Sequence, residues 1–343
     1  MKVIRKPGSV IVINPYADIS WDAVSPLHSV NHMHTFSANV GGEEWNRGPD
    51  HQDGERTFQS MYDLGIRHFP LANYHPSKPT YPLEDYFAGV PADAIGCPNA
   101  ETSVSGERGH YCTIGSFYDS REDPSSTWRE LFDHVFEQLA YEGGGGIVIN
   151  HPKRTGLSLE AIIERFDADP RVLGIEAYNH RCEYQYGGTG DARSIWDELL
   201  MTGRPVLGFF NPDFHCPWDL DLSWSSETLG RNVLLVEQTT ESAAANAYRA
   251  GHTYGALRGS GLEFSAIEAG KDDIAVTLTD HATIEFISDR AVVETVEGST
   301  ATYDFNGKET YVRVEASDDS GEKIFSQAIV FEDRTHGGEE RHT

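Results

Sequence analysis

Between residue 28 and about residue 258, short apolar runs alternate with segments in which apolar residues recur every three to four positions. A short apolar run is typical of a buried strand, and a repeat near 3.6 residues is typical of an amphipathic helix. Their alternation predicts an α/β domain with a largely parallel sheet. The expected strands are 28–34, 67–73, 97–103, 110–116, 146–151, 173–178, 205–211 and 232–237, and the expected helices are 56–65, 127–142, 158–166, 192–203 and 240–250.

The pattern changes near Gly261, after which short strand-like segments are separated by turn residues and no long helix is expected. This part is typical of a small antiparallel β domain. Its expected strands are 264–267, 274–278, 283–287, 291–296, 301–305, 311–316 and 323–331. The predicted organisation is an N-terminal extension (1–26), an α/β domain (27–260), a β domain (261–332) and a disordered tail (333–343).

Composition narrows the class of protein. The 343 residues are 38% hydrophobic, enough for a sizeable core, and contain no apolar run long enough for a transmembrane helix. We therefore expect no membrane association, and without a recognisable signal peptide a cytoplasmic location is the default expectation. The four cysteines, Cys97, Cys112, Cys182 and Cys216, show no metal-binding spacing and are expected to be free and mostly buried.

The formal net charge of −27 argues against a surface that binds the nucleic-acid backbone. Seven Lys stand against twenty Arg, and the acidic residues are spread along the whole chain. This pattern favours a halophilic protein, because a salt-rich cytoplasm screens the repulsion between carboxylates. An ordinary acidic protein is the alternative.

The sequence Asn-His-Met-His-Thr at 31–35 is the first sign of a metal site, because alternate residues of a strand face the same side. Further His, Glu and Asp residues follow at or just past the predicted strand ends, where the active sites of parallel α/β barrels form. His110 is the exception, since it begins a strand. Any one of these histidines could instead be buried and hydrogen-bonded to the backbone. The candidate ligands, which could hold two to three divalent ions (Zn, Mn or Fe), are His32, His34, His75, Glu101, His110, His151, Asp213 and His215.

Over about residues 27 to 260 this set resembles the PHP (polymerase and histidinol phosphatase) superfamily of metal-dependent phosphoesterases. The matching segments are His32-Met33-His34, Asn73-Tyr74-His75, Asn99-Ala100-Glu101 with the later His110, Asn150-His151-Pro152 and Asp213-Phe214-His215. The resemblance implies a distorted (β/α)7 barrel with a trinuclear metal site. Asn39 and Tyr74 stand where the family has stronger ligands or an acid, which implies that one metal position is weak or empty.

The resemblance also implies roles for single residues. Glu101 would bridge two ions, and Asp213 would bind an ion and accept a proton from water. His180 and Tyr74 are alternative acids for the leaving group, and Glu176 either supports the site or only packs. The basic residues Arg108, Lys153, Arg154 and Arg181 would hold a substrate phosphate, unless they pair with nearby acids.

The function predicted from these features is hydrolysis of a small phosphorylated metabolite or nucleotide by a metal-activated hydroxide. One alternative is a hydrolase of carboxylic esters or carbamates that uses the same ions. Another is a non-catalytic metal-binding module, and the β domain is a possible surface for homo-oligomerisation.

Overall fold

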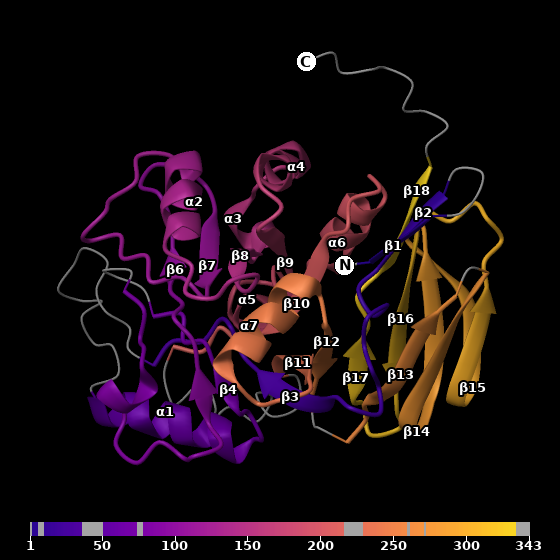
Figure 1. The fold of residues 1–343 in the computed structure, drawn as a ribbon, viewed down its shortest axis with the longest axis horizontal. Helices are drawn as coiled ribbons and strands as arrows, with labels where there is room; N and C mark the ends of the chain where they lie inside the picture. Colours follow the sequence, from indigo (N-terminus) through magenta and orange to yellow (C-terminus); the bar gives the residue numbers. More distant parts are fainter. Residues whose placement is uncertain are drawn as a thin grey trace.

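The computed structural model describes residues 2–5, 10–35, 51–73, 78–215, 229–258, 261–270 and 272–333. One of its sheets has five strands, namely β6 (Glu101–Thr102), β7 (His110–Ile114), β8 (Gly146–Asn150), β9 (Val172–Asn179) and β10 (Leu207–Asn211). They lie in the order β10-β9-β8-β7-β6 (Figure 1). β8, β9 and β10 are parallel, whereas β7 runs antiparallel to both of its neighbours.

A second sheet links the α/β region to the C-terminal strands. Its first members are β1 (Lys2–Arg5), β2 (Val10–Asn14), β3 (Ser25–Ser29), β4 (His68–Phe69), β5 (Ile95–Gly96), β11 (Gly230–Val236) and β12 (Thr253–Leu257). The others are β13 (Phe264–Ala269), β14 (Asp273–Ser288), β15 (Ala291–Asp304), β16 (Tyr311–Ser317), β17 (Lys323–Phe325) and β18 (Ile329–Asp333). The main path is β1-β2-β18-β16-β17-β12-β11-β3-β4-β5, and β13 and β15 pair with β14, which pairs with β16. β3, β4 and β5 are parallel to one another.

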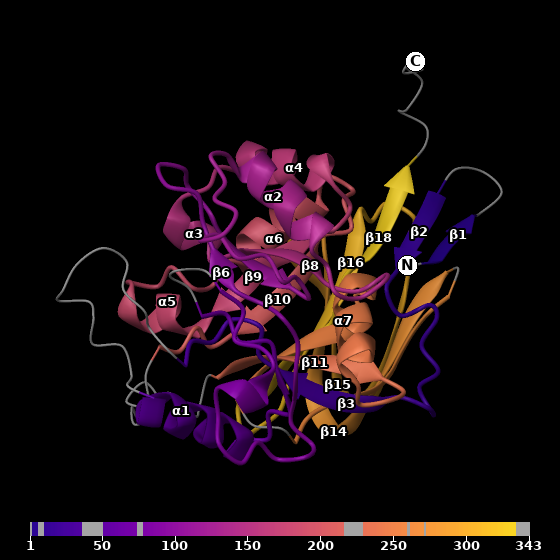
Figure 2. The same ribbon diagram turned by 60° about the vertical axis from the view of Figure 1, so that its left-hand side comes forward.

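Amphipathic helices cover the five-stranded sheet. They are α2 (Trp128–Glu137), α4 (Leu159–Ala168) and α6 (Arg193–Leu200), whose buried side chains share one core with Ile147, Ile149 and Ile175 of the sheet. Thr127 and Ser158 cap α2 and α4 by accepting hydrogen bonds from backbone N–H groups. Figure 2 shows these helices together on one side of the molecule.

Other helices lie elsewhere on the α/β region. α7 (Glu241–Ala250) packs against β11, and α1 (His51–Asp63) lies near β4 and β3 (Figure 1). Three short helices were not expected from the sequence, namely α3 (Pro152–Thr155), α5 (His180–Gln185) and the 3-10 helix η2 (Leu83–Asp85). None of the helices in the described ranges is long and apolar enough to cross a bilayer.

The mixed α/β class is confirmed, but the strands in the described residues form no closed barrel. At one junction of the two sheets, the side-chain amide of Asn232 in β11 bonds both backbone groups of Phe210 in β10, at 3.0 and 3.1 Å. At the other junction, the N–H of Glu101 donates to the carbonyl of Ala72 at 3.0 Å. The two sheets are therefore joined at both edges by separate hydrogen bonds instead of strand ladders.

Several expected strands are shorter than their apolar runs. The strand expected at 28–34 is β3, which ends at Ser29, so His32 and His34 lie beyond it. The expected 67–73 and 97–103 strands contain only two-residue ladders, β4 and β6. The extended chain past β3 is held instead by separate bonds, including one from the N–H of His34 to the carbonyl of Phe214 at 2.7 Å.

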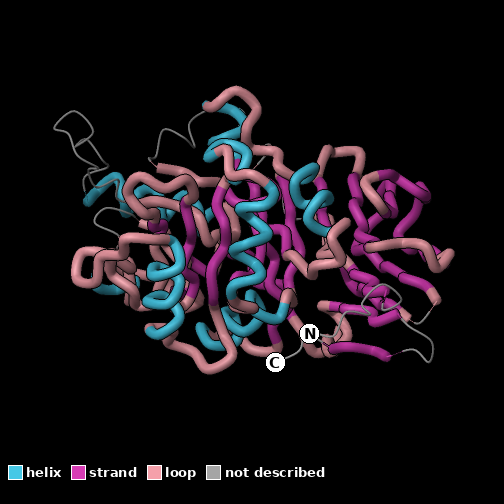
Figure 3. Tube along the Cα trace, turned by 90° about the horizontal axis from the view of Figure 1, so that it is seen from above, coloured by secondary structure: helices cyan, strands magenta, loops and turns pink. Residues whose placement is uncertain are grey.

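The strands after residue 261 are antiparallel, as expected, but two pairs of expected strands are merged in β14 and β15, and the strand expected at 323–331 is divided into β17 and β18. The segments expected at 274–278 and 283–287 are one strand, β14, with a register shift between Thr277 and Ala282. β2 pairs with β18, so the N-terminal strands lie on the C-terminal β unit. This unit carries no helix in the part of the chain that the structure describes (Figure 3). Cys97, Cys112 and Cys182 are free and buried, as expected, and Cys216 lies outside the described residues.

A buried ion pair ties the C-terminal β unit to the α/β region. The guanidinium of Arg313 in β16 donates to both carboxylate oxygens of Asp197 in α6, at 2.8 and 3.0 Å. The hydroxyl of Tyr311 also donates to Asp197, at 2.8 Å. Because both charged groups are almost fully buried, loss of Arg313 removes the guanidinium that compensates the Asp197 carboxylate, whereas Arg313 itself also pairs with Glu315.

We predict that Arg313→Ala lowers the free energy of unfolding by about 3 to 5 kcal/mol, the usual cost of breaking a buried pair. Urea unfolding of the purified protein measures this change. The matched control is Arg129→Ala, because Arg129 and Glu164 form a pair that is more than half exposed, and we expect a loss below about 1 kcal/mol. Equal losses in the two variants would contradict a structural role for the buried pair.

Candidate metal centre

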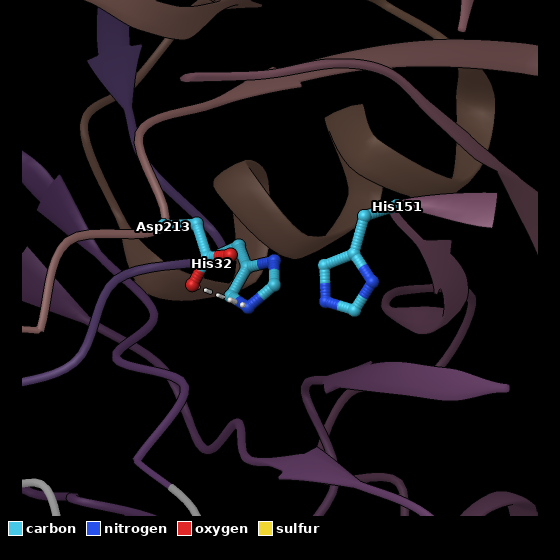
Figure 4. Close-up of side chains that lie close together, drawn as sticks. All are labelled: His32, His151 and Asp213. Atoms are coloured by element: carbon cyan, nitrogen blue, oxygen red, sulfur yellow. Dashed lines mark ion pairs between the residues drawn. The ribbon is translucent and has the colours of Figure 1, made fainter. Parts of the chain in front are cut away.

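Seven of the eight expected ligands lie in the described part of the chain, and the structure brings them together. The eighth, His75, lies outside the described residues, as do Tyr74 and Asn39. Figure 4 shows His32, His151 and Asp213 pointing toward one another from three separate segments. The seven are His32, His34, Glu101, His110, His151, Asp213 and His215.

His32 and His34 form the centre of the cluster, and both side chains are fully buried. His32 Nε2 lies 3.2 Å from Glu101 Oε2 and 3.2 Å from Asp213 Oδ1. His34 Nε2 lies 3.2 Å from Glu101 Oε2 and 3.5 Å from Asp213 Oδ1. Both imidazoles therefore face the same two carboxylates.

A second group uses the other oxygen of Glu101. His110 Nδ1 lies 2.9 Å and His151 Nε2 3.2 Å from Glu101 Oε1. His110 reaches this group because β7 is antiparallel, which places its first residue beside Asn150, the last residue of β8. The one apparent exception to the strand-end rule thus lies at the same sheet edge as the others.

A third group lies around Asp213. His215 Nδ1 is 3.5 Å from Asp213 Oδ1, and the rings of His215 and His34 are 4.1 Å apart between centroids. The backbone of Asp213 has a φ of 52°, and that of His151 has a φ of 28°. Positive φ is unfavourable for residues with a Cβ, and such strain is often found at functional sites, where the surrounding structure maintains it.

The cluster suits more than one divalent ion. Four overlapping groups of three residues place their ligand atoms within 4.8 Å of one another, and Glu101 and Asp213 each belong to two of them. His32 Nε2 and Asp213 Oδ1 are buried and have no hydrogen-bond partner among the described residues. Buried polar atoms without partners are costly, and imidazole nitrogens with carboxylate oxygens are donors that Zn, Mn and Fe accept.

The electrostatics of the cluster also favour a cation. Burial raises the pKa of Glu101 and Asp213, but the nearby histidines outweigh burial and hold both pKa values below their usual range. Burial lowers the pKa of His32, but the carboxylates of Asp213, Glu176 and Glu101 raise it overall. Burial, reinforced by His34, lowers the pKa of His215 to about 3, so this ring is neutral at pH 7 and its lone pair is available to a metal.

Other predicted site residues lie around the cluster in varied settings. His180 is buried, with ring centroids 4.8 Å from Tyr184 and 5.5 Å from Phe214, so its predicted role as an acid stays a prediction. Arg181 is close enough to His215 for its positive charge to lower the pKa of that ring.

The other three predicted phosphate ligands contact the protein itself. Arg108 donates to the carbonyl of Gly156 at 3.0 Å, and Arg154 stacks on Tyr186 at 3.7 Å. Lys153 donates to the carbonyls of Gly188 and Asp191 at 2.9 and 3.3 Å. Their binding of a substrate phosphate stays a prediction.

The sequence interpretation missed three asparagines that bond the acids of the site. Asn150, Asn179 and Asn211 are the last residues of β8, β9 and β10. Asn150 donates to Glu101 at 3.2 Å, and Asn179 donates to Asp213 at 3.1 Å. The sequence contained a signal for these asparagines, because each one directly follows an apolar run and precedes a residue of the site or a proline.

No family model and no curated protein matches the chain in sequence. A solved structure does match its fold, a two-domain protein from Bacteroides vulgatus ATCC 8482 described as containing a predicted PHP-like metal-dependent phosphoesterase. The TM-score is 0.51 at 12% sequence identity, over 86% of this chain and 91% of that one. The chain therefore has a PHP-like fold, with a buried cluster of His, Glu and Asp residues at the strand ends.

We predict that His32→Ala lowers the number of ions bound per chain by at least one, because its imidazole belongs to two of the overlapping groups. Elemental analysis after incubation with Zn²⁺ or Mn²⁺ measures the content. The control is His134→Ala, which removes a partly exposed histidine of α2 that pairs with Asp123. If both variants keep the wild-type metal content, the cluster does not bind metal.

Proposed function

We propose that the protein is a metal-dependent hydrolase of phosphoric esters that cleaves a small phosphorylated metabolite or nucleotide with two to three Zn, Mn or Fe ions. The observation that carries this proposal is the set of four overlapping ligand groups built on Glu101 and Asp213. The PHP-like fold supports it, because the matched protein is described as containing a predicted phosphoesterase of that kind.

The residues of the cluster have different roles in the proposed reaction. Divalent ions in such a site polarise the ester and lower the pKa of water. Glu101 can serve two positions, since Oε2 faces His32 and His34 while Oε1 faces His110 and His151. Oδ1 of Asp213 faces the histidines of the cluster, while Oδ2 accepts a hydrogen bond from the side-chain amide of Asn179.

The surroundings fit an anionic substrate and exchange of protons with solvent. Arg181 brings a positive charge near His215, which would offset the repulsion between a phosphate and the acidic chain. The side chain of His110 is 48% exposed, which is the highest exposure among the seven described ligands, so solvent can reach the cluster at this residue.

Hydrolysis of a carboxylic ester or carbamate is the second candidate. It is favoured by the contacts of Arg108 and Lys153, which bind backbone carbonyls of the protein itself. A neutral ester needs no cationic clamp, so it would leave these contacts in place.

Two esters with the same leaving group separate the candidates, namely p-nitrophenyl phosphate and p-nitrophenyl acetate. We expect metal-loaded protein to hydrolyse the phosphate ester, and Asp213→Ala to lower kcat/KM at least about 100-fold, because losing a ligand should cost at least as much as the roughly 10- to 100-fold effect of losing a residue that supports one. Asp280→Ala, which changes an exposed acid of β14, is the control and should keep full activity. Turnover of the acetate alone would favour the second candidate, and retained turnover in Asp213→Ala would remove the cluster from the reaction.

A further inference from the structure

Glu176 is a fully buried carboxylate beneath the cluster and belongs to none of the four ligand groups. Its side chain comes from the middle of β9 and is bonded on both oxygens. Oε1 lies 2.7 Å from His32 Nδ1 and accepts a bond from Asn211 Nδ2 at 2.9 Å. Oε2 accepts bonds from the backbone N–H of His151 at 2.8 Å and from Asn179 Nδ2 at 2.9 Å.

These contacts determine which nitrogen of His32 carries the proton. An ionised carboxylate can only accept hydrogen bonds, so a neutral His32 ring that bonds Glu176 must carry its proton on Nδ1. The lone pair of the ring then lies on Nε2. That atom is the one that faces Glu101 and Asp213 and has no hydrogen-bond partner among the described residues.

The asparagines hold Glu176 without cancelling its charge. Asn179 and Asn211 end adjacent parallel strands and are paired in register, so both amides reach the same carboxylate. Asn179 also donates to Asp213 Oδ2, which leaves Oδ1 of that acid directed at His32. Because amides are neutral, three buried acids keep their negative charge for a cation, whereas Lys or Arg at these positions would compete with it.

We propose that Glu176 is a positioning residue, which the asparagines at the ends of β9 and β10 hold in place. Glu176 fixes the Nδ1–H tautomer of His32. It thereby sets the affinity of the metal-ion position that His32 shares with Glu101 and Asp213. The inference rests on the metal-binding part of the proposed function. It does not depend on which ester the protein hydrolyses.

The affinity test compares Glu176→Gln with the wild type in Zn²⁺ competition against a chelating indicator. A glutamine has the same shape but only one acceptor oxygen, so its NH₂ group must face donors. We expect the tightest Zn²⁺ dissociation constant to rise about 10- to 100-fold, the usual effect of losing such support. We also expect the visible spectrum of the Co²⁺-loaded protein to change.

A matched control is Glu309→Gln in the C-terminal β unit. Glu309 is also a buried carboxylate with four donors, the hydroxyl of Tyr303 at 2.9 Å and the backbone N–H groups of Asn306, Gly307 and Lys308 at 2.7, 2.9 and 3.0 Å. Its loss should leave Zn²⁺ affinity and the Co²⁺ spectrum unchanged. If both variants shift the affinity equally, or if neither does, the positioning role is wrong.

A second measurement stays decisive even if Glu176→Gln fails to fold. Long-range ¹H–¹⁵N NMR of the metal-free wild type, labelled on histidine and recorded at a pH above the raised pKa of His32, reports the tautomer of the neutral ring, and His32→Gln assigns its signals. We expect the Nδ1–H form, and the Nε2–H form would overturn the inference. If the wild type binds Zn²⁺ and shows the expected tautomer but hydrolyses neither ester, the proposed function fails while the positioning role stands.

Discussion

The burial of Glu101 and Asp213 among imidazoles is the interaction on which the rest of the site depends. Both carboxylates are almost fully buried, and an isolated buried charge is very costly. Five imidazoles and two asparagine amides surround them, and without a metal the only positive charge among these groups is that of protonated imidazoles such as His32, whose pKa the acids raise. Divalent ions would compensate both acids together, which explains why the ligand groups overlap on these two residues. The binding of cations would therefore explain why these two acids are buried together.

The fold serves this arrangement by bringing strand ends together. β8, β9 and β10 run parallel and end on asparagines beside the cluster, while the antiparallel β7 contributes its first residue at the same edge. The second sheet supplies His32 and His34 from the chain that follows β3. Hydrogen bonds such as those of Asn232, and no strand ladder, join the two sheets at this edge, so the site lies between two sheets. The C-terminal β unit extends the second sheet and is linked to the α/β region by Arg313 and Asp197.

Much of this could be predicted from the sequence, because periodicity and strand-end chemistry are local signals. The helices expected at 127–142 and 158–166 are present as α2 and α4, with caps at Thr127 and Ser158, but α2 ends at Glu137, five residues earlier than expected. The strand expected at 28–34 is β3 at Ser25–Ser29, because the residues at 28–34 do not distinguish a strand ladder from an extended chain held by separate hydrogen bonds. The antiparallel direction of β7 and the contacts of Lys153 and Arg108 depend on distant segments, so no local pattern contains them. In the sequence, Asn179 and Asn211 are visible only as asparagines that each end a predicted strand. Their support of one carboxylate follows only once β9 and β10 are known to be neighbours.

Anomalous X-ray diffraction from crystals loaded with Zn²⁺, recorded above and below the zinc edge, tests most directly whether the strand ends form a multinuclear metal centre. We predict at least two anomalous peaks within coordination distance of the cluster, with Glu101 or Asp213 shared between neighbouring ions. A loaded crystal without anomalous density among His32, His34, Glu101 and Asp213 would contradict this. The convergence of these side chains would then be a buried hydrogen-bonded network without a metal.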